Sequence, residues 1–311
     1  MTLVTLADER YALTLAVLGR SISENLSTRH ATLYVVDGGI TPETKQHLLA
    51  SWDPQRMRVE FVAPHFGQEQ ELPVWGRFPP LTYARIFVPL LLPQDCPKAI
   101  VLDSDTIVLT DMERLWNIEL GDNSLLAVQD STIPLVSSEG GLGRYQELGI
   151  PPGHPYFNAG VMLVNVEKWR RTGVPGRVME FIHQHAAELN YCDQDGLNAV
   201  LWDDWGELDS RWQVQPRLHA RLHEGTQATA DAWILHFTGR LKPWLYRGST
   251  LSDRLFYQYL DRTWWSGWRP PSSPQAWLYR LYDSPLKNLF HPVVQWGNAL
   301  ARYLSRRSAR V

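Results

Sequence analysis

An Asp-Ser-Asp triplet at the end of an apolar run is the strongest chemical signal in the sequence. Residues 99–111 read AIVLDSDTIVLTD, so Asp103 and Asp105 close a run that is typical of a buried strand. Alternation along an extended chain places both carboxylates on one face, where they can reach a single hard cation. A second triplet, at 193–195, opens a helix-like segment, where aspartate is also an ordinary N-terminal residue. We therefore predict the first triplet as a metal site.

Two residues near a later apolar run extend this interpretation. His236 lies in AWILHF, and Lys242 follows in TGRLKPW. One imidazole with two carboxylates suits Mn²⁺ better than Ca²⁺, because imidazole is a borderline ligand. A lysine six residues after the histidine can reach a phosphate bound at the same site. The ordinary alternatives are a satisfied histidine beside the core and a solvated surface lysine.

The tripeptide Asn158-Ala159-Gly160 interrupts another apolar run. Gly160 indicates a close approach of two backbones, and Asn158 offers donors and an acceptor to a sugar hydroxyl. The alternative is a turn or a bulge. No GxGxxG follows the first apolar run, and no GxxxxGK[ST] occurs in the sequence. A nucleotide is therefore not held by a glycine phosphate loop, which leaves a metal as the natural partner of a pyrophosphate.

The composition bounds the class of protein. The chain has 311 residues, a net charge of −3 and 44% hydrophobic residues, so we expect a folded α/β protein and no nucleic-acid partner. Two cysteines provide neither a disulfide framework nor zinc-ligand spacing, which fits a reducing compartment. Charges at residues 8–10 interrupt any signal peptide, and the longest apolar run, residues 86–92, is too short to span a membrane. We expect a cytoplasmic protein.

Strand-like and helix-like runs alternate through the first half of the chain. This order predicts a parallel sheet covered on both faces, with a ligand crevice at the carboxyl ends of its strands. The predicted strands are 3–6, 31–36, 59–63, 99–102, 156–165 and 232–237, and the predicted helices are 11–26, 42–52, 81–91 and two within 174–201 that meet near Cys192. Residues 131–155, rich in Ser, Gly and Pro, read as a long loop over a site.

Five motifs in order resemble glycosyltransferase family 8. They read TLADERYA, LDSDTIVLTDMERLW, YFNAGVMLVNVEKWR, YCDQDGLNAV and ILHFTGRLKPW, and the resemblance covers about residues 3–245. This family includes bacterial lipopolysaccharide galactosyl- and glucosyltransferases and glycogenin. The resemblance implies a GT-A fold, which is a Rossmann-like α/β domain with a mixed, mainly parallel sheet and helices on both faces. It also implies a UDP-sugar donor, Mn²⁺ with Mg²⁺ as the alternative, and transfer with retention at the anomeric carbon.

The resemblance implies roles for individual residues. The metal ligands would be Asp103, Asp105 and His236. Asp193 and Gln194 would lie below the anomeric carbon, and Asp130 would join Asn158 in holding donor-sugar hydroxyls. The remaining donor-binding residues would be Ala7, Asp8 and Tyr11 at the uracil and ribose, Arg85 near the sugar and diphosphate, Ser104 and Ala159 within their motifs, and Gly239 and Lys242 in the diphosphate-binding loop. The chain departs from the family at Leu6 and Glu9, which replace residues that are often Ala or Ser and Asp.

These observations predict a retaining transferase that moves glucose or galactose from UDP-glucose or UDP-galactose to a glycan or glycolipid acceptor. Asp193 or Gln194 acts as a nucleophile, or the acceptor attacks from the leaving-group side; the sequence favours neither. One alternative is a self-glucosylating protein like glycogenin, for which Tyr145 and Tyr156 are candidate acceptors. A second alternative is a non-catalytic membrane-surface module that keeps the fold.

The end of the chain has a different composition. We predict a catalytic domain at 1–269 and a basic, aromatic tail at 270–311. Residues 275–311 hold six Lys or Arg residues against one acid, together with several Trp and Tyr residues. Such a segment favours peripheral contact with an anionic membrane, here its cytoplasmic face. The alternative is a C-terminal helix packed on the catalytic domain.

Overall fold

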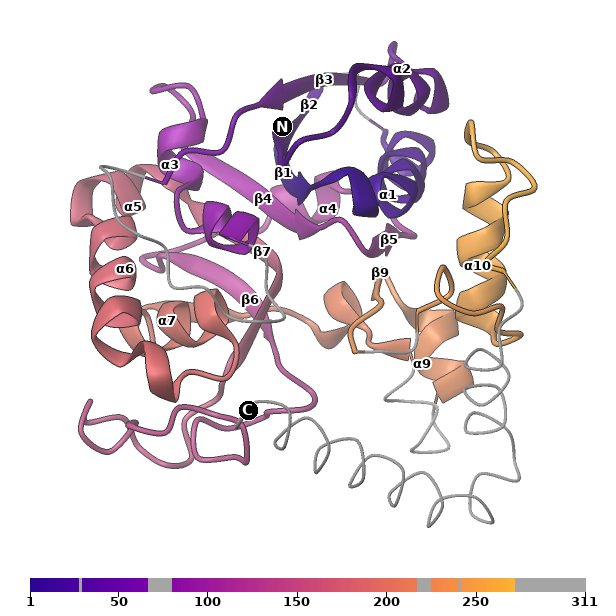
Figure 1. Cartoon of the computed structure of the whole chain (residues 1–311). Helices are drawn as coiled ribbons and strands as arrows, with labels where there is room; N and C mark the ends of the chain where they lie inside the picture. Colours follow the sequence, from indigo (N-terminus) through magenta and orange to yellow (C-terminus); the bar gives the residue numbers. More distant parts are fainter. Residues whose placement is uncertain (28–29, 67–79, 217–224, 240–241, 272–311) are drawn as a thin grey trace, which may run out of the picture.

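The computed structural model describes residues 1–27, 30–66, 80–216, 225–239 and 242–271, and Figure 1 traces them along the chain. The predicted tail lies almost entirely outside these residues. No helix among them is both long and apolar enough to cross a bilayer.

A seven-stranded sheet forms the centre of the molecule, in the order β3-β2-β1-β4-β7-β6-β8. Strand β7 runs antiparallel to β4 and β6, and the remaining neighbours are parallel. The sheet is therefore mixed and mainly parallel, as predicted. The strands are β1 (Thr2–Ala7), β2 (Ala31–Asp37), β3 (Met57–Val62), β4 (Lys98–Asp103), β6 (Leu125–Gln129), β7 (Phe157–Asn165) and β8 (Trp205–Glu207).

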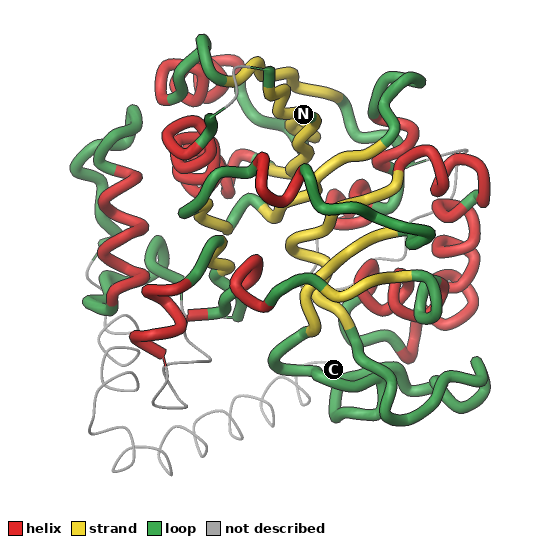
Figure 2. Tube along the Cα trace, turned by 180° about the vertical axis from the view of Figure 1, so that it is seen from behind, coloured by secondary structure: helices red, strands yellow, loops and turns green. Residues whose placement is uncertain are grey.

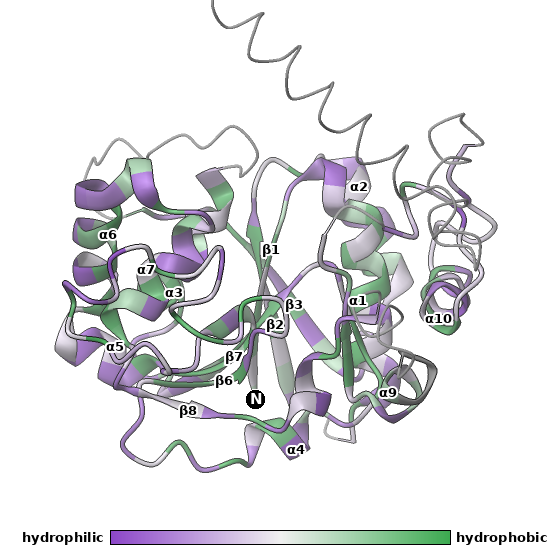
Figure 3. Cartoon of the chain, turned by 90° about the horizontal axis from the view of Figure 1, so that it is seen from below, coloured by the Kyte–Doolittle hydropathy of each residue, from purple (hydrophilic) through white to green (hydrophobic). Residues whose placement is uncertain are grey.

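Helices cover both faces of this sheet, as Figures 2 and 3 show. Neighbouring strand residues enter opposite cores: Val101 packs in one apolar cluster, and Ile100 packs in the other. Burial on both faces explains why these strands read as continuous apolar runs. One face carries α3 (Val88–Leu91), α5 (Val166–Thr172), α6 (Val174–His185) and α7 (Cys192–Val200), and the other carries α1 (Ala12–Asn25), α2 (Pro42–Ser51) and α4 (Glu113–Trp116).

A second, two-stranded sheet joins distant parts of the chain. Strand β5 (Thr106–Val108) pairs antiparallel with β9 (Ile234–His236), so that Thr106 faces His236. Helices α9 (Gly225–Asp231) and α10 (Leu251–Leu260) lie on this side of the molecule (Figure 1). Because β5 begins directly after Asp105, this pairing brings the end of β9 to the end of β4.

The predicted helix at 81–91 is wrong. The chain forms a 3-10 helix, η2 (Pro80–Arg85), followed by the single turn of α3. Pro89 lies in the first turn of α3, where a missing backbone N–H costs nothing, whereas a continuous helix would place the ring against a preceding carbonyl. Strand 232–237 is also corrected, because β9 is shorter and belongs to the small sheet. The short strands β5, β6 and β8 were not predicted.

Candidate active site

Three predicted metal ligands converge at the carboxyl end of β4. The ligand atoms of Asp103, Asp105 and His236 all lie within 4.8 Å of one another. Asp103 ends β4, Asp105 precedes β5, and His236 ends β9. The His236 Nε2 atom lies 3.4 Å from Asp103 Oδ2 and 3.2 Å from Asp105 Oδ1. Two carboxylates and an imidazole form a donor set that fits Mn²⁺ or Mg²⁺ at this point.

The imidazole of His236 fits because Gly160 has no side chain. A Cβ atom at Gly160 would lie 2.2 Å from His236 Cε1 and 2.6 Å from Nδ1. Gly160 belongs to β7, the strand next to β4, so the main sheet provides one wall of the space that holds the ring. The prediction of a close approach at this glycine is corrected in kind: the neighbour is the side chain of His236, where a second backbone was expected.

Arg85 links the metal-site candidates to Asp193. Its Nη2 donates to Asp103 Oδ1 at 2.6 Å, and its Nη1 donates to the carbonyl of Ala159 at 2.7 Å. Its Nε lies 2.7 Å from Asp193 Oδ2. The Nε–H bond does not point at an acceptor, so we treat this last contact as an ion pair without a hydrogen bond. One buried guanidinium thus pairs with two carboxylates, and the three groups together keep one negative charge.

Lys242 lies on the other side of the aspartate pair. Its Nζ is 2.5 Å from Asp105 Oδ2 and also donates to the carbonyl of Phe237. The Lys242 and Asp105 side chains are both 12% exposed. Gly239, in the same segment, is exposed and has a left-handed φ of 76°. Ser104 lies buried in the turn between the two aspartates.

The charges of these groups shift one another's pKa. Burial alone would raise the pKa of Asp103 and Asp105, but Arg85, Lys242 and His236 outweigh it and lower both pKa values. Burial would lower the pKa of His236, but the two carboxylates outweigh burial and raise it to about 9. The positive charges around Asp103 and Asp105 therefore stabilise the ionised form of both carboxylates.

A buried polar cluster lies beside the metal-site candidates. Asp130 accepts hydrogen bonds at one oxygen from the backbone N–H of Thr132 and Ile133 and from the Thr132 hydroxyl. Its other oxygen accepts from Asn158 Nδ2 at 2.7 Å and from Gln194 Nε2 at 3.2 Å. Five donors fill the acceptor positions of this carboxylate. Asp130 therefore holds the two amides and begins the 131–155 loop at the site.

Asp193 and Gln194 enter the site from the first turn of α7. Gln194 Oε1 accepts the backbone N–H of Ala159 at 3.0 Å. Burial raises the pKa of Asp193 to about 6, against the lowering effect of Arg85. The residue before them, Cys192, has a φ of 39°, the one positive value at a non-glycine among the residues described here. Strain of this kind is often found at functional sites.

The last residue of the second triplet, Asp195, bonds to the chain that precedes α7 and to Tyr156. It accepts the backbone N–H of Asn190 at 2.6 Å and of Tyr191 at 2.8 Å, and also the Tyr156 hydroxyl. Tyr156 is fully buried. Asp195 therefore fixes the start of α7, which separates its role from that of Asp193.

The end of β1 supplies the residues predicted at the nucleoside. Ala7 ends the strand, and Asp8 accepts the backbone N–H of Arg10 and Tyr11 and pairs with the Arg10 guanidinium at 2.6 Å. Burial and the charges of Asp105 and other acids raise the pKa of Tyr11 to about 12. The Tyr11 ring packs edge-on against Trp244, two residues after Lys242, with ring centroids 6.5 Å apart.

The two departures from the family pattern have roles in the fold. Leu6 packs in the core. Glu9 accepts the backbone N–H of Thr41 at 2.9 Å and the Thr44 hydroxyl at 2.6 Å, and so holds the N-terminus of α2. Both side chains therefore make their contacts in the fold and not with the candidate site residues.

Sequence reasoning missed Gln213, which belongs to the 3-10 helix η4 (Ser210–Gln213). Its Nε2 lies 3.2 Å from His236 Nδ1, on the side of the ring that faces away from the carboxylates. No motif or periodicity marks this residue. Only the backbone pairing of residue 214 with β9 could have suggested it.

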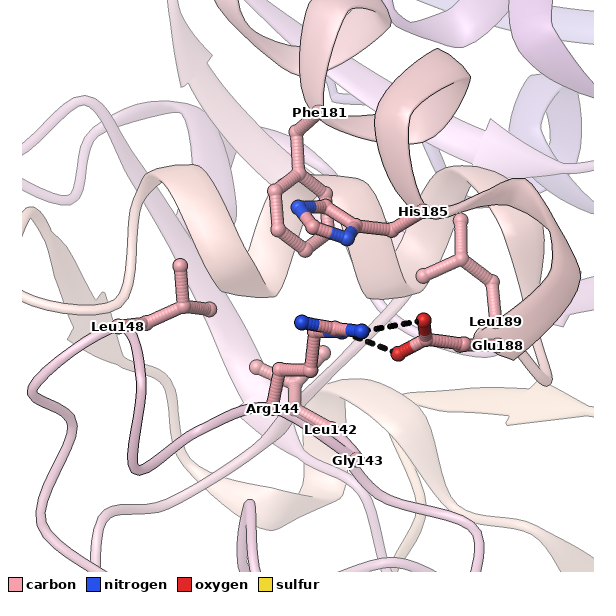
Figure 4. Close-up of a pocket in the computed structure, with 8 residues that line it drawn as sticks. All are labelled: Leu142, Gly143, Arg144, Leu148, Phe181, His185, Glu188 and Leu189. Carbon is pink, nitrogen blue, oxygen red and sulfur yellow. Dashed lines mark hydrogen bonds and ion pairs between the residues drawn. The ribbon is translucent and has the colours of Figure 1, made fainter.

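A small surface hollow lies elsewhere, between the 131–155 loop and α6 (Figure 4). Arg144 crosses it to pair with Glu188, with Nη2 2.7 Å from Oε1. Phe181 and His185 lie on its α6 side. None of the predicted site residues lines this hollow, so we assign the ion pair to holding the loop against the end of α6.

Comparison with known proteins agrees with this geometry. The family model described as Glycosyl transferase family 8 matches residues 2–248. General stress protein A of Bacillus subtilis is 29% identical over 279 residues, which cover 86% of this chain and 95% of that protein. The glycosyltransferase GlyD of Streptococcus pneumoniae is 27% identical over 280 residues, 85% of this chain and 31% of that protein.

Solved structures show the same architecture. The galactosyltransferase LgtC, in complex with donor and acceptor sugar analogs, aligns with a TM-score of 0.70 at 26% identity, over 90% of this chain and 100% of that one. The glycosyltransferase GlyE of Streptococcus pneumoniae aligns with a TM-score of 0.64 at 20% identity, over 85% of this chain and 60% of that one. The GT-A fold predicted from the motifs is confirmed.

Proposed function

The chain belongs to glycosyl transferase family 8, and on that premise we propose that it transfers glucose or galactose from a UDP-sugar to a glycan or glycolipid acceptor. The observation that carries the proposal is the convergence of Asp103, Asp105 and His236 between two cationic side chains. This is the arrangement needed to receive a diphosphate through a metal ion. The anomeric configuration is retained in the proposed reaction.

The departing diphosphate gains negative charge as the glycosidic bond breaks. Asp103, Asp105 and His236 would hold Mn²⁺, with Mg²⁺ as the alternative, whose charge would offset the growing charge on the diphosphate. Lys242 would turn from Asp105 toward a diphosphate oxygen, since its ammonium group already reaches the edge of the site. We propose that the protein backbone at Gly239 and Ser104 contacts the diphosphate. The nucleoside would be contacted by Ala7, Asp8 and Tyr11.

The sugar would lie over the amides of Asn158 and Gln194. Each amide donates one N–H to Asp130. The second N–H of Asn158 can meet a sugar hydroxyl, whereas Gln194 also bonds to the buried Tyr156 hydroxyl and helps to hold the sugar-facing wall in place. We therefore propose that Asp130 orients these amides and does not bind the sugar itself, because its acceptor positions are filled. Arg85, bonded to the carbonyl of Ala159, fixes the strand that carries Asn158.

Retention follows from either of two routes. In the first, an Asp193 carboxylate oxygen bonds to the anomeric carbon as the bond to UDP breaks. The acceptor oxygen then displaces that carboxylate, and its hydroxyl proton passes to a phosphate oxygen of UDP. In the second, the acceptor attacks from the side that UDP leaves, and a phosphate oxygen takes its proton. The pairing of Asp193 with Arg85 keeps a negative charge near the oxocarbenium-like centre in both routes.

The described contacts favour this proposal over both alternatives. The buried Tyr156 hydroxyl donates to Asp195, so it is not presented as a self-glucosylation acceptor. Tyr145 packs against the small apolar cluster under the 131–155 loop. A non-catalytic module would have no use for the paired aspartates and their two cations. We retain the proposal of a catalytic domain at 1–269 that works at the cytoplasmic face of the membrane, in contact with it through the tail.

A donor screen tests the proposed function. The protein is incubated with UDP-glucose or UDP-galactose, Mn²⁺ and glycan or glycolipid acceptors, and UDP release is measured with and without EDTA. Asp105→Asn should abolish release, because the ion would lose a ligand beside the diphosphate. Asp111→Asn is the matched control, since Asp111 accepts from the backbone N–H groups of Ser27 and Glu113 and is not one of the predicted site residues. Full activity of Asp105→Asn in EDTA would contradict the proposal.

A further inference from the structure

We propose that Gln213 is a positioning residue of the metal site, accepting the Nδ1 hydrogen of His236 and so directing the Nε2 lone pair at the cation. The inference rests on the proposed metal-dependent transfer. An imidazole that gives its Nε2 lone pair to a metal carries its hydrogen on Nδ1, and that hydrogen needs an acceptor when the ring is buried. His236 is 4% exposed, so water does not supply this acceptor freely.

Gln213 is placed to supply it. Its amide lies 3.2 Å from Nδ1, and the side chain is buried. Among the residues that the structure describes, Gln213 Oε1 is a buried polar atom without a hydrogen-bond partner, so no second hydrogen bond from them fixes the orientation of the amide. A half-turn of the amide exchanges its oxygen and nitrogen and presents Oε1 to Nδ1–H. That orientation fixes the tautomer in which Nε2 faces Asp103 and Asp105.

The surrounding backbone leaves the ring little freedom. Gly160 closes one side, where a Cβ atom would overlap Cε1 and Nδ1. The backbone N–H of His236 donates to the carbonyl of Val214 at 2.9 Å, which ties β9 to the residue after Gln213. The same short segment thus holds both the backbone and the ring nitrogen of His236. Gln213 therefore acts on the tautomer and orientation of the ring, and within the described residues its side chain makes no other hydrogen bond.

Metal affinity, measured without donor or acceptor, tests the inference. Mn²⁺ binding to the full-length protein is followed by electron paramagnetic resonance of the free ion. Gln213→Met removes the acceptor at similar volume and should raise the Kd for Mn²⁺ by about 10- to 100-fold. Gln213→Glu keeps an acceptor and should bind Mn²⁺ within a few-fold of the unchanged protein. Gln215→Met is the matched control, because Gln215 is also buried but bonds to Ser131 and not to His236.

A second measurement observes the ring hydrogen in the unchanged protein, and a variant serves only to assign the signal. Nitrogen-15 spectra of histidine-labelled protein with saturating MgCl₂ should show the His236 hydrogen on Nδ1, with the signal assigned by its loss in His236→Gln. A hydrogen on Nε2 in that spectrum would overturn the inference. Equal Mn²⁺ affinity of Gln213→Met and the unchanged protein, or an equal loss in Gln213→Glu, would also overturn it while leaving the metal site intact. Absence of any saturable Mn²⁺ or Mg²⁺ site in the unchanged protein would instead overturn the proposed metal site, and the inference with it.

Discussion

The ion pair between Lys242 and Asp105 connects the stability of the protein to its metal site. Without a cation, Lys242 neutralises Asp105 in a mostly buried place. Lys242→Ala should therefore lower the free energy of unfolding of the metal-free protein by about 1–3 kcal/mol. Saturating Mn²⁺ should reduce that difference, because the ion replaces the missing charge beside the carboxylate. Thermal melts with EDTA and with MnCl₂ measure both effects.

The same substitution should slow the reaction even when metal is saturating. Loss of a donor to the developing charge of a leaving group costs about 10²–10³ in turnover. UDP release at saturating donor and Mn²⁺ measures this loss. If Lys242→Ala turns over UDP-sugar at the normal rate, Lys242 serves the fold alone.

Ionisation of Asp193 should lower the free energy of unfolding as the pH rises. Its pKa in the folded chain is about 6, against an ordinary value of 3.8, so the folded state binds this proton more tightly than the unfolded state. Its ionisation therefore removes stability as the pH rises from about 4 through 6, and the full cost is present above that window. Asp193→Asn should raise the free energy of unfolding at pH 7.5 by about 1–3 kcal/mol.

Urea unfolding at pH 7.5 and pH 4 distinguishes this cause from general repacking. The gain in Asp193→Asn should be large at the higher pH and small at the lower one. The variant should also lose sugar transfer, because the charge beside the anomeric carbon is gone. Equal gains at both pH values would show that ionisation of Asp193 is not the source.

Residues with a chemical signature in the sequence could be predicted, and residues that act through them could not. Asp103, Asp105 and His236 converge as predicted, because strand ends and motif order carry that information. Two of the five hydrogen bonds at Asp130 come from loop backbone N–H groups whose positions no pattern fixes. Gln213 reaches His236 across 23 residues of sequence, in a segment with no distinctive pattern.

Among the elements, helix α7 depends on side-chain hydrogen bonds with the segments around it. Its start depends on Asp195, which accepts two backbone N–H groups and the buried Tyr156 hydroxyl. Tyr156→Phe should lower the free energy of unfolding by about 1–2 kcal/mol, because Asp195 stays buried with one donor fewer. Sugar transfer to an added acceptor should persist. Denaturant melts and a transfer assay measure the two effects.

Tyr156→Phe also tests the self-glucosylation alternative at this residue. Mass spectrometry of the purified protein after incubation with UDP-glucose reports any attached hexose. If the unchanged protein gains hexose and Tyr156→Phe does not, the tyrosine is an acceptor and the buried geometry is not the working one. Tyr145→Phe is the matched control for the loop.

Most of the long elements could be predicted, and the short ones could not. Helix α1 and strands β1, β2 and β4 have strong periodicity or continuous apolar runs. Strands β5 and β8 have three residues each, too few for a period, and their partners lie far away in the chain. Residues 86–92 are apolar throughout, so only Pro89 indicated where the helix within them must begin.

At the scale of the whole molecule, charge is divided unevenly along the chain. Residues 275–311 carry a net charge of +5, and the rest of the chain therefore carries −8 out of the total of −3. Exposed Trp264 stacks on His47 close to where the described chain ends, with ring centroids 4.2 Å apart. An acidic body with a basic end should meet an anionic surface in one orientation.

The tail should therefore bind anionic membranes and leave the chemistry to the rest of the chain. Each basic residue near such a surface contributes about 1 kcal/mol, and Trp and Tyr favour the interface. The full-length protein should sediment with vesicles rich in phosphatidylserine at low salt, and high salt should release it because the charges are screened.

Deleting 275–311 should abolish sedimentation and preserve UDP-sugar hydrolysis. Replacing Arg302, Arg306, Arg307 and Arg310 by Gln is the matched control that keeps length and aromatic residues, and it should weaken binding strongly. If the full-length protein fails to sediment at low salt, the tail does not bind membranes and its alternative role, packing on the catalytic domain, is favoured. The proposal of a glycolipid acceptor would then lose its main support.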